Sequence, residues 1–122
     1  MTTLNVAYAL SALVGIGIIF IGARFLLAPS VAATGYGVAG QGAYLSAKGV
    51  RDIASGLFVF VLIGSGQPRA LGLIMAAAAL IPVGDALIVL RNGGPRVIAF
   101  GIHGATAVAM LVIAALLLVS TA

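Results

Sequence analysis

Four long runs of apolar residues divide the chain, at about residues 4–27, 44–63, 70–90 and 97–119. Each run approaches the roughly 20 residues that an α-helix needs to cross the hydrocarbon core of a bilayer. Helices are favoured over open sheet because lipid offers no hydrogen-bond partner to an unpaired backbone group. The pattern predicts an all-α fold: an antiparallel integral membrane four-helix bundle, a single domain over residues 1–122, with both termini on the same side.

The breaks between the runs differ in length. Residues 64–68 and 91–95 are short clusters of glycine, proline and polar residues, which predict tight hairpins between antiparallel helices. The first connection, residues 28–43, is longer, rich in glycine and weakly apolar. It fits either a re-entrant or interfacial segment that caps the bundle or an ordinary mobile loop, and the sequence leaves both open.

Composition supports a membrane protein. Hydrophobic residues make up 63% of the chain and charged residues 7%, and the mean hydropathy is +1.31. So few charges would not cover the surface of a soluble domain. The absence of cysteine excludes disulfides and thiolate chemistry. The net charge is +4, but the basic residues are scattered rather than clustered with aromatic residues, which argues against nucleic-acid binding.

The positions of the basic residues predict an orientation. One face, which holds the first and third connections, carries five of them: Arg24, Lys48, Arg51, Arg91 and Arg96. The opposite face, with both termini, carries Arg69. The positive-inside rule therefore places the first and third connections in the cytoplasm and the termini outside, in a multi-pass protein of the plasma (inner) membrane.

Small residues recur at four-residue spacing in three of the runs, which permits the backbones of neighbouring helices to approach closely. The positions are Ala7, Ser11, Gly15, Gly72, Ala76, Gly101, Ala105 and Ala109. We expect these positions to face other helices in a compact bundle.

The two carboxylates of the chain, Asp52 and Asp85, lie within or beside apolar runs. An ionisable group at membrane depth costs about 3 kcal/mol and is by default a candidate functional residue. With a rise of about 1.5 Å per residue, Arg24, Asp52, Asp85 and His103 lie roughly 7 to 12 Å from the five-charge face. All four runs thus place a polar group in the same half of the membrane, and we expect these groups to surround one pocket open to the cytoplasm.

Local spacing suggests partners within the second run. Lys48 pairs with Asp52 at the four-residue spacing, whereas Arg51 aligns with Ser55 and stays free for Asp85 or for a polar group of a ligand. In the third run a proline at position 82 lacks an amide hydrogen, so the helix is expected to bend one turn before Asp85.

The candidate site residues form two groups. The candidate catalytic residues are Asp52, Asp85 and His103. His103 and one aspartate would exchange protons, and the other aspartate would orient the histidine. The candidate ligand-binding residues, which would hold a polar group or line the pocket, are Arg24, Arg51, Tyr44 and Ser55. Tyr36 and Gln41 are further candidates for the pocket mouth. We expect no cofactor and no metal ion, because one histidine and two aspartates show no recognised ligand spacing.

Each of these residues also has a structural interpretation. Lys48 and Arg51 are in positions from which long side chains snorkel to the headgroups. His103 is suited to a neutral hydrogen bond between helices. The two aspartates would then form ion pairs with Arg24 and Arg51 that hold the bundle in register without any chemistry.

Short motifs resemble an uncharacterised family of small four-helix membrane proteins of bacteria and fungi. They are the segments Gly22–Pro29 and Lys48–Asp52, the following Gly56, and the pairs Asp85–Ala86 and His103–Gly104. The family is a domain of unknown function that is distantly similar to DoxX-like proteins. The resemblance implies an integral four-helix bundle and no established activity. DoxX-like proteins have been linked to quinone or thiol redox chemistry, and the absence of cysteine argues against the thiol role here.

Three functions are compatible with these features, and whether the protein is an enzyme stays open. The first is a site within the membrane that binds a hydrophobic small molecule with a polar end, such as an isoprenoid, a quinone or a lipid, and transforms it by acid/base chemistry. The second is a small proton-coupled transporter that works as an oligomer. The third is an accessory membrane subunit with a purely structural charge cluster. The expected partners are the bilayer, the hydrophobic ligand and a second copy of the chain.

Overall fold

A computed structural model describes residues 2–40 and 42–122, and every regular element in these two ranges is helical. The elements in chain order are α1 (Thr3–Leu27), α2 (Pro29–Tyr36), α3 (Ala43–Gly64), α4 (Pro68–Ala78), α5 (Leu80–Arg91), α6 (Arg96–Ile98), the π-helical segment η1 (Ala99–Gly104) and α7 (Ala105–Ser120). The predicted all-α fold is confirmed over the described residues.

Within the described residues, three helical stretches are long and apolar enough to cross a membrane: Thr3–Leu27, Pro68–Arg91 and Arg96–Ser120. The remaining long helix, α3, has 22 residues and carries three charged residues in its N-terminal half. Many large apolar side chains lie on the surface of the molecule, on all the long helices. Such a surface suits lipid rather than water, so the helices indicate insertion into a membrane.

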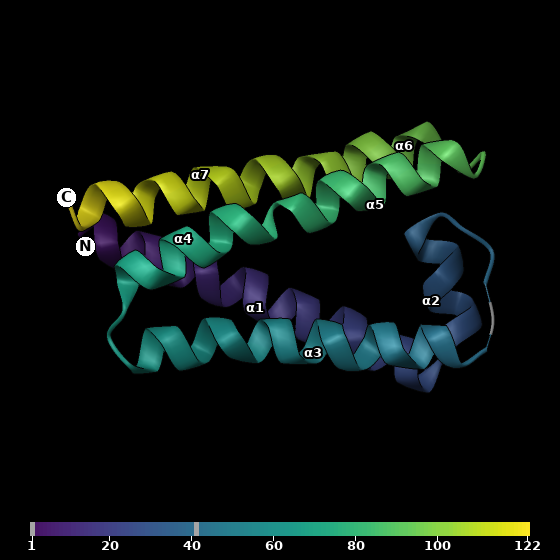
Figure 1. Cartoon of the computed structure of the whole chain (residues 1–122), viewed down its shortest axis with the longest axis horizontal. Helices are drawn as coiled ribbons and strands as arrows, with labels where there is room; N and C mark the ends of the chain where they lie inside the picture. The colour runs from purple at the N-terminus through teal and green to yellow at the C-terminus, as the bar shows by residue number, and fades with distance from the viewer. Residues whose placement is uncertain (1, 41) are drawn as a thin grey trace.

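The long helices form two pairs (Figure 1). Helix α1 packs along α3, and the rod formed by α4 and α5 runs beside the rod of α6, η1 and α7. The pairs meet at the end of the molecule that holds both chain termini, where Ala7, Leu71, Met75 and Leu117 are buried in a common core. At the other end the short helix α2 stands between the two pairs.

Glycines bring α1 and α3 into close contact. A Cβ atom added at Gly22 would lie 2.5 Å from the carbonyl oxygen of Gly49, and one added at Gly56 would lie 2.6 Å from that of Gly15. No side chain fits at these crossings, because the neighbouring atoms belong to backbone. The two crossings hold residues 49–56 of α3 against residues 15–22 of α1.

Two irregularities interrupt the other pair of rods. The rod of α4 and α5 is interrupted at Ala79, three residues before Pro82, whose ring prevents the regular hydrogen bond to the carbonyl of Ala78. The bend therefore lies where the proline predicts it, and Asp85 follows one turn later. In the last rod, η1 adopts the wider π-helical winding and includes the buried His103. Such segments occur frequently at functional sites.

The small residues predicted at helix contacts divide into two sets. Buried positions are Ala7, Ser11, Gly15 and Gly72, and Ala76 is partly buried against the core. Exposed positions are Gly101, Ala105 and Ala109, so the prediction is wrong for the last run. Helix α7 packs instead through Ala107, Met110, Ile113, Ala114 and Leu117. The four-residue spacing of small residues marks one face of this helix, but that face is exposed and the opposite face contacts the other helices. Small residues lie on both faces, so their spacing does not distinguish the two.

Candidate functional site

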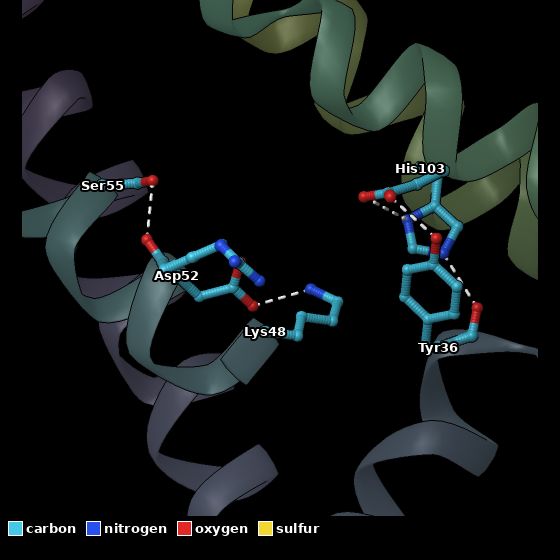
Figure 2. Close-up of polar contacts among 7 residues, drawn as sticks. Tyr36, Lys48, Asp52, Ser55 and His103 are labelled. Atoms are coloured by element: carbon cyan, nitrogen blue, oxygen red, sulfur yellow. Dashed lines mark hydrogen bonds and ion pairs between the residues drawn. The ribbon is translucent and has the colours of Figure 1, made fainter. Parts of the chain in front are cut away.

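Tyr36, Asp85 and His103 form a compact polar cluster at the α2 end of the molecule (Figure 2). The Tyr36 hydroxyl donates a hydrogen bond of 2.7 Å to Oδ1 of Asp85. The Nδ1 atom of His103 lies 4.0 Å from Oδ2 of the same carboxylate. The rings of Tyr36 and His103 are tilted against each other, with centroids 4.7 Å apart. Three elements, α2, α5 and η1, thus converge on one carboxylate.

The position of Tyr36 depends on the end of α2. Gly37 ends this helix in the left-handed conformation with φ of 106°, which glycine adopts without strain. A Cβ atom at Gly37 would touch the side chains of Ile98 and Val89 at 3.0 and 3.1 Å, and one at Gly94 would collide with the carbonyl oxygen of Gly37. The end of α2 is therefore seated on the turn between α5 and α6, which holds Tyr36 beside Asp85.

The hydrogen bond of His103 to the backbone defines its two nitrogens. Its Nε2 lies 2.8 Å from the carbonyl oxygen of Tyr36. Because a carbonyl oxygen can only accept, Nε2 must carry a hydrogen and donate it. The other nitrogen, Nδ1, faces Oδ2 of Asp85 at 4.0 Å, which is an ion-pair distance when the imidazole is charged.

A second polar group lies on α3. The Lys48 ammonium donates a hydrogen bond of 2.7 Å to Oδ2 of Asp52, one helical turn away. The same ammonium lies 4.7 Å from the ring centroid of Phe25 and 5.3 Å from that of Tyr36, within the range of cation–π attraction. In Figure 2 the Lys48 side chain extends from α3 toward Tyr36. Lys48 thus connects the local pair on α3 to the cluster around Asp85.

The environment of Tyr36 keeps its hydroxyl protonated. Burial of the phenol raises its pKa above the ordinary value of 10.0, and the hydrogen bond to Asp85 together with the negative charges of Asp85 and Asp52 raises it further. Both effects disfavour the phenolate. Tyr36 is therefore a stable hydrogen-bond donor to Asp85 under all ordinary conditions.

An open hollow of about 240 Å³ adjoins both polar groups. Its walls include Phe25, Tyr36, Tyr44, Leu45 and Lys48, together with small residues of the segment after α2. The lining is mainly apolar, and Tyr36 and Lys48 belong both to it and to the polar groups. A hydrophobic molecule with one polar end matches this combination.

The structure separates the candidate catalytic residues into two groups. Asp85 and His103 come together across two elements, whereas Asp52 bonds to Lys48 within α3. Over residues 2–40 and 42–122 these are the two ion pairs within 4.0 Å, so neither Arg24 nor Arg51 contacts a carboxylate. Instead of an arginine, the phenol of Tyr36 bonds to Asp85.

The candidate ligand-binding residues are also dispersed. Tyr44 is 88% exposed and lines the hollow. Ser55 donates its hydroxyl hydrogen to the backbone carbonyl of Arg51 at 2.8 Å. Its hydrogen bond is thus formed within α3. Arg51 is exposed and Arg24 is half-buried. Gln41, expected at the pocket mouth, lies outside the described residues.

Sequence reasoning gave too small a role to Tyr36 and Lys48. Lys48 was expected as the partner of Asp52, but its approach to two aromatic rings was not. Tyr36 was expected only at a pocket mouth, because its partner Asp85 is 49 residues away in the chain and no spacing rule connects them. The available signal was the glycine after Tyr36, which is suited to ending a short helix.

Over the described residues, an all-α chain with apolar helices and a half-buried polar cluster at one end indicates a helical membrane protein. More particularly, the chain belongs to the family described as a domain of unknown function, DUF4267, whose model matches residues 15–117. The match contains every residue of the two polar groups. It confirms the resemblance to an uncharacterised family, while the distant similarity to DoxX-like proteins stays a prediction. No curated protein and no solved structure matches the chain.

Proposed function

We propose that the protein is a single-domain four-helix bundle of the plasma (inner) membrane, with α3 as a fourth crossing helix beside the three apolar stretches. Both chain termini lie at one end of the molecule, and α2 lies at the other (Figure 1). The α2 end carries Arg24, Lys48, Arg51, Arg91 and Arg96, and the opposite end carries Arg69. This charge asymmetry supports a cytoplasmic location for the α2 end and an outside location for the termini.

The function that the geometry supports best is binding of a hydrophobic small molecule with a polar end, of the isoprenoid, quinone or lipid type, combined with proton exchange. The observation that carries this proposal is the double role of Tyr36. Its ring lines the apolar hollow, and its hydroxyl bonds to the Asp85 carboxylate that faces His103. A ligand in the hollow would therefore lie next to a group that holds an exchangeable proton.

The roles of the residues follow from their chemistry. The apolar walls around Phe25 and Leu45 would hold the hydrophobic part of the ligand, and the Lys48 ammonium would attract an oxygen of its polar end. The pair of Asp85 and His103 would accept a proton on Nδ1 of His103 and return it. Tyr36, which stays protonated, would orient Asp85 and connect the pair to the hollow.

The direct test is mass spectrometry of small molecules that copurify with the protein in mild detergent. We expect one hydrophobic compound in wild-type protein, and about a tenfold loss of it in Asp85→Asn and in Tyr36→Phe, as removal of one key polar contact predicts. Tyr8→Phe is the matched control, because Tyr8 packs near the core at the other end of the molecule. Equal retention by Asp85→Asn, Tyr36→Phe and Tyr8→Phe would contradict a ligand site at Tyr36 and favour a structural accessory subunit.

Proton-coupled transport is the second candidate, and one observation favours it. Asp85 lies on a helical rod interrupted at Ala79, and interrupted helices with an ionisable residue are typical of transport sites. A single copy encloses little volume, so transport would require an oligomer. Reconstituted liposomes should then show substrate flux driven by a pH gradient and abolished by Asp85→Asn. Ligand retention without any such flux would reject transport and retain the binding function.

A further inference from the structure

The turn between α5 and α6 carries two arginines without carboxylate partners. Arg91 ends α5 and Arg96 begins α6, and both side chains are exposed. Within the described part of the chain, no carboxylate lies within 4.0 Å of either guanidinium, because the two carboxylates face Lys48 and His103. These arginines also end two of the apolar stretches, Pro68–Arg91 and Arg96–Ser120. Such positions lie at the depth of lipid headgroups, where phosphate is the available anion.

A surface hollow of about 610 Å³ adjoins this turn. It is lined by Leu90, Gly93, Gly94, Arg96 and Phe100. Arg96 and Phe100 are four residues apart in a helical rod and so lie on the same face, with Phe100 one turn farther from the end of the span. Phe100 is 61% exposed. The lining of the hollow thus combines bare backbone in the turn, a cation at the start of α6 and an aromatic side chain one turn farther along the rod.

The floor of the hollow is fixed by backbone contacts. The Gly94 N–H donates to the carbonyl of Val89 at 2.8 Å, and Gly93 adopts a φ of 71° that favours glycine. Gly94 also lies directly against the carbonyl of Gly37 at the end of α2. The turn is therefore held in place by a neighbouring element. At Gly93 an added Cβ atom would meet nothing within 4 Å, so the backbone there borders open space.

We propose that the turn between α5 and α6 is a binding site for one anionic phospholipid. Arg96, assisted by Arg91, holds the phosphate, and an acyl chain lies along Phe100 and Leu90. A cation beside apolar side chains in one lining matches a phosphate joined to an acyl chain, and the unpaired positive charge complements an anionic leaflet. The site is separate from the hollow beside Tyr36 and does not depend on the function proposed for it. Through Gly94, however, a bound lipid would rest on the turn that supports α2.

The experiment is native mass spectrometry of the full chain in mild detergent, titrated with dioleoyl phosphatidylglycerol and, separately, with dioleoyl phosphatidylcholine. Wild-type protein should retain phosphatidylglycerol in preference to phosphatidylcholine. Arg96→Ala should weaken binding of phosphatidylglycerol about fivefold, as expected for the loss of one basic side chain at a headgroup. Arg69→Ala is the matched control, because Arg69 is an exposed arginine at the opposite end, and it should leave that binding unchanged.

Two further variants separate the headgroup from the chain. Arg96→Lys should retain most of the preference for phosphatidylglycerol, and its helical circular dichroism checks that the fold is intact. Phe100→Ala should weaken both lipids alike. Equal losses of phosphatidylglycerol binding in Arg96→Ala and Arg69→Ala would overturn the proposal. They would show that the anionic lipid is attracted to any basic residue of the protein. Displacement of the lipid by soluble glycerol 3-phosphate at matched concentration would also overturn it, because the site would then bind free phosphate rather than a lipid.

Discussion

The two carboxylates of this chain occupy contrasting environments. Asp52 bonds to Lys48 one turn away on the same helix, whereas Asp85 receives Tyr36 from α2 and faces His103 from η1. The first pair forms whenever α3 is helical. The second group exists only when three elements are assembled, which is why it is the better candidate for function. Burial of a charged side chain alone therefore does not identify a functional site. The convergence of polar residues from separate helices is more informative.

The largest loss of stability is expected from a variant that displaces α2 from the turn between α5 and α6. Such a variant leaves the pair of Lys48 and Asp52 intact. Gly94→Ala introduces a Cβ atom against the Gly37 carbonyl, and since backbone cannot move aside easily, we expect a loss of about 3 kcal/mol of stability. Unfolding in mixed micelles, followed by circular dichroism, measures this loss. Gly84→Ala is the control, because a Cβ atom there meets nothing within 4 Å. Equal stability of the two variants would show that α2 is not seated on this turn.

Removal of one hydroxyl gives the next largest effect. Tyr36→Phe leaves the Asp85 carboxylate without its donor, and a hydrogen bond to a charged group contributes about 2 kcal/mol. The same unfolding assay should show this loss, while Tyr8→Phe should change stability by less than about 0.5 kcal/mol. If both variants behave alike, the contact between Tyr36 and Asp85 does not stabilise the fold.

A smaller effect is expected from alkaline pH. Because the pKa of Tyr36 is raised in the folded protein, the fold favours the protonated phenol. Its contribution to stability is fully present below the ordinary value of 10.0 and declines as the pH rises above it. The stability difference between wild type and Tyr36→Phe should therefore be constant up to that pH and shrink beyond it. A difference that begins to shrink near neutral pH would contradict the environment described for Tyr36.

The smallest change in stability should follow the removal of both charges of the pair formed by Lys48 and Asp52. The double variant Lys48→Gln with Asp52→Asn eliminates both charges together, so no unpaired charge remains, and the stability should change by less than about 1 kcal/mol. Unfolding in mixed micelles checks this prediction. A much larger loss would mean that Lys48 stabilises the fold mainly through its contacts with Phe25 and Tyr36.

Much of this architecture could be predicted from the sequence, because long apolar runs need no knowledge of their partners. The break before Asp85 was predictable from Pro82, and the bond between Lys48 and Asp52 from their spacing. Equal depth along two helices also led to the expectation that Asp85 and His103 approach each other, and they lie 4.0 Å apart.

Other features had no local signal. Helix α2 is short, with a weakly apolar sequence, and forms where either a re-entrant or interfacial segment capping the bundle or a mobile loop was expected. The π-helical winding around His103 depends on packing rather than on a residue type. The arginines were assigned to the site by depth alone, but depth does not determine the direction of a side chain, and Arg51 is exposed. The phenol that bonds to Asp85 comes from the connection, which carried no helical pattern.

The proton-exchanging group that we propose consists of Asp85 and His103 and excludes Asp52. His103 is the single histidine of the chain, so ¹⁵N magnetic resonance of selectively labelled protein observes it alone. The account predicts a hydrogen on Nε2 in wild-type protein, a changed Nδ1 resonance in Asp85→Asn and an unchanged spectrum in Asp52→Asn. An Nε2 without hydrogen, or an Nδ1 resonance that responds to Asp52→Asn and ignores Asp85→Asn, would contradict it.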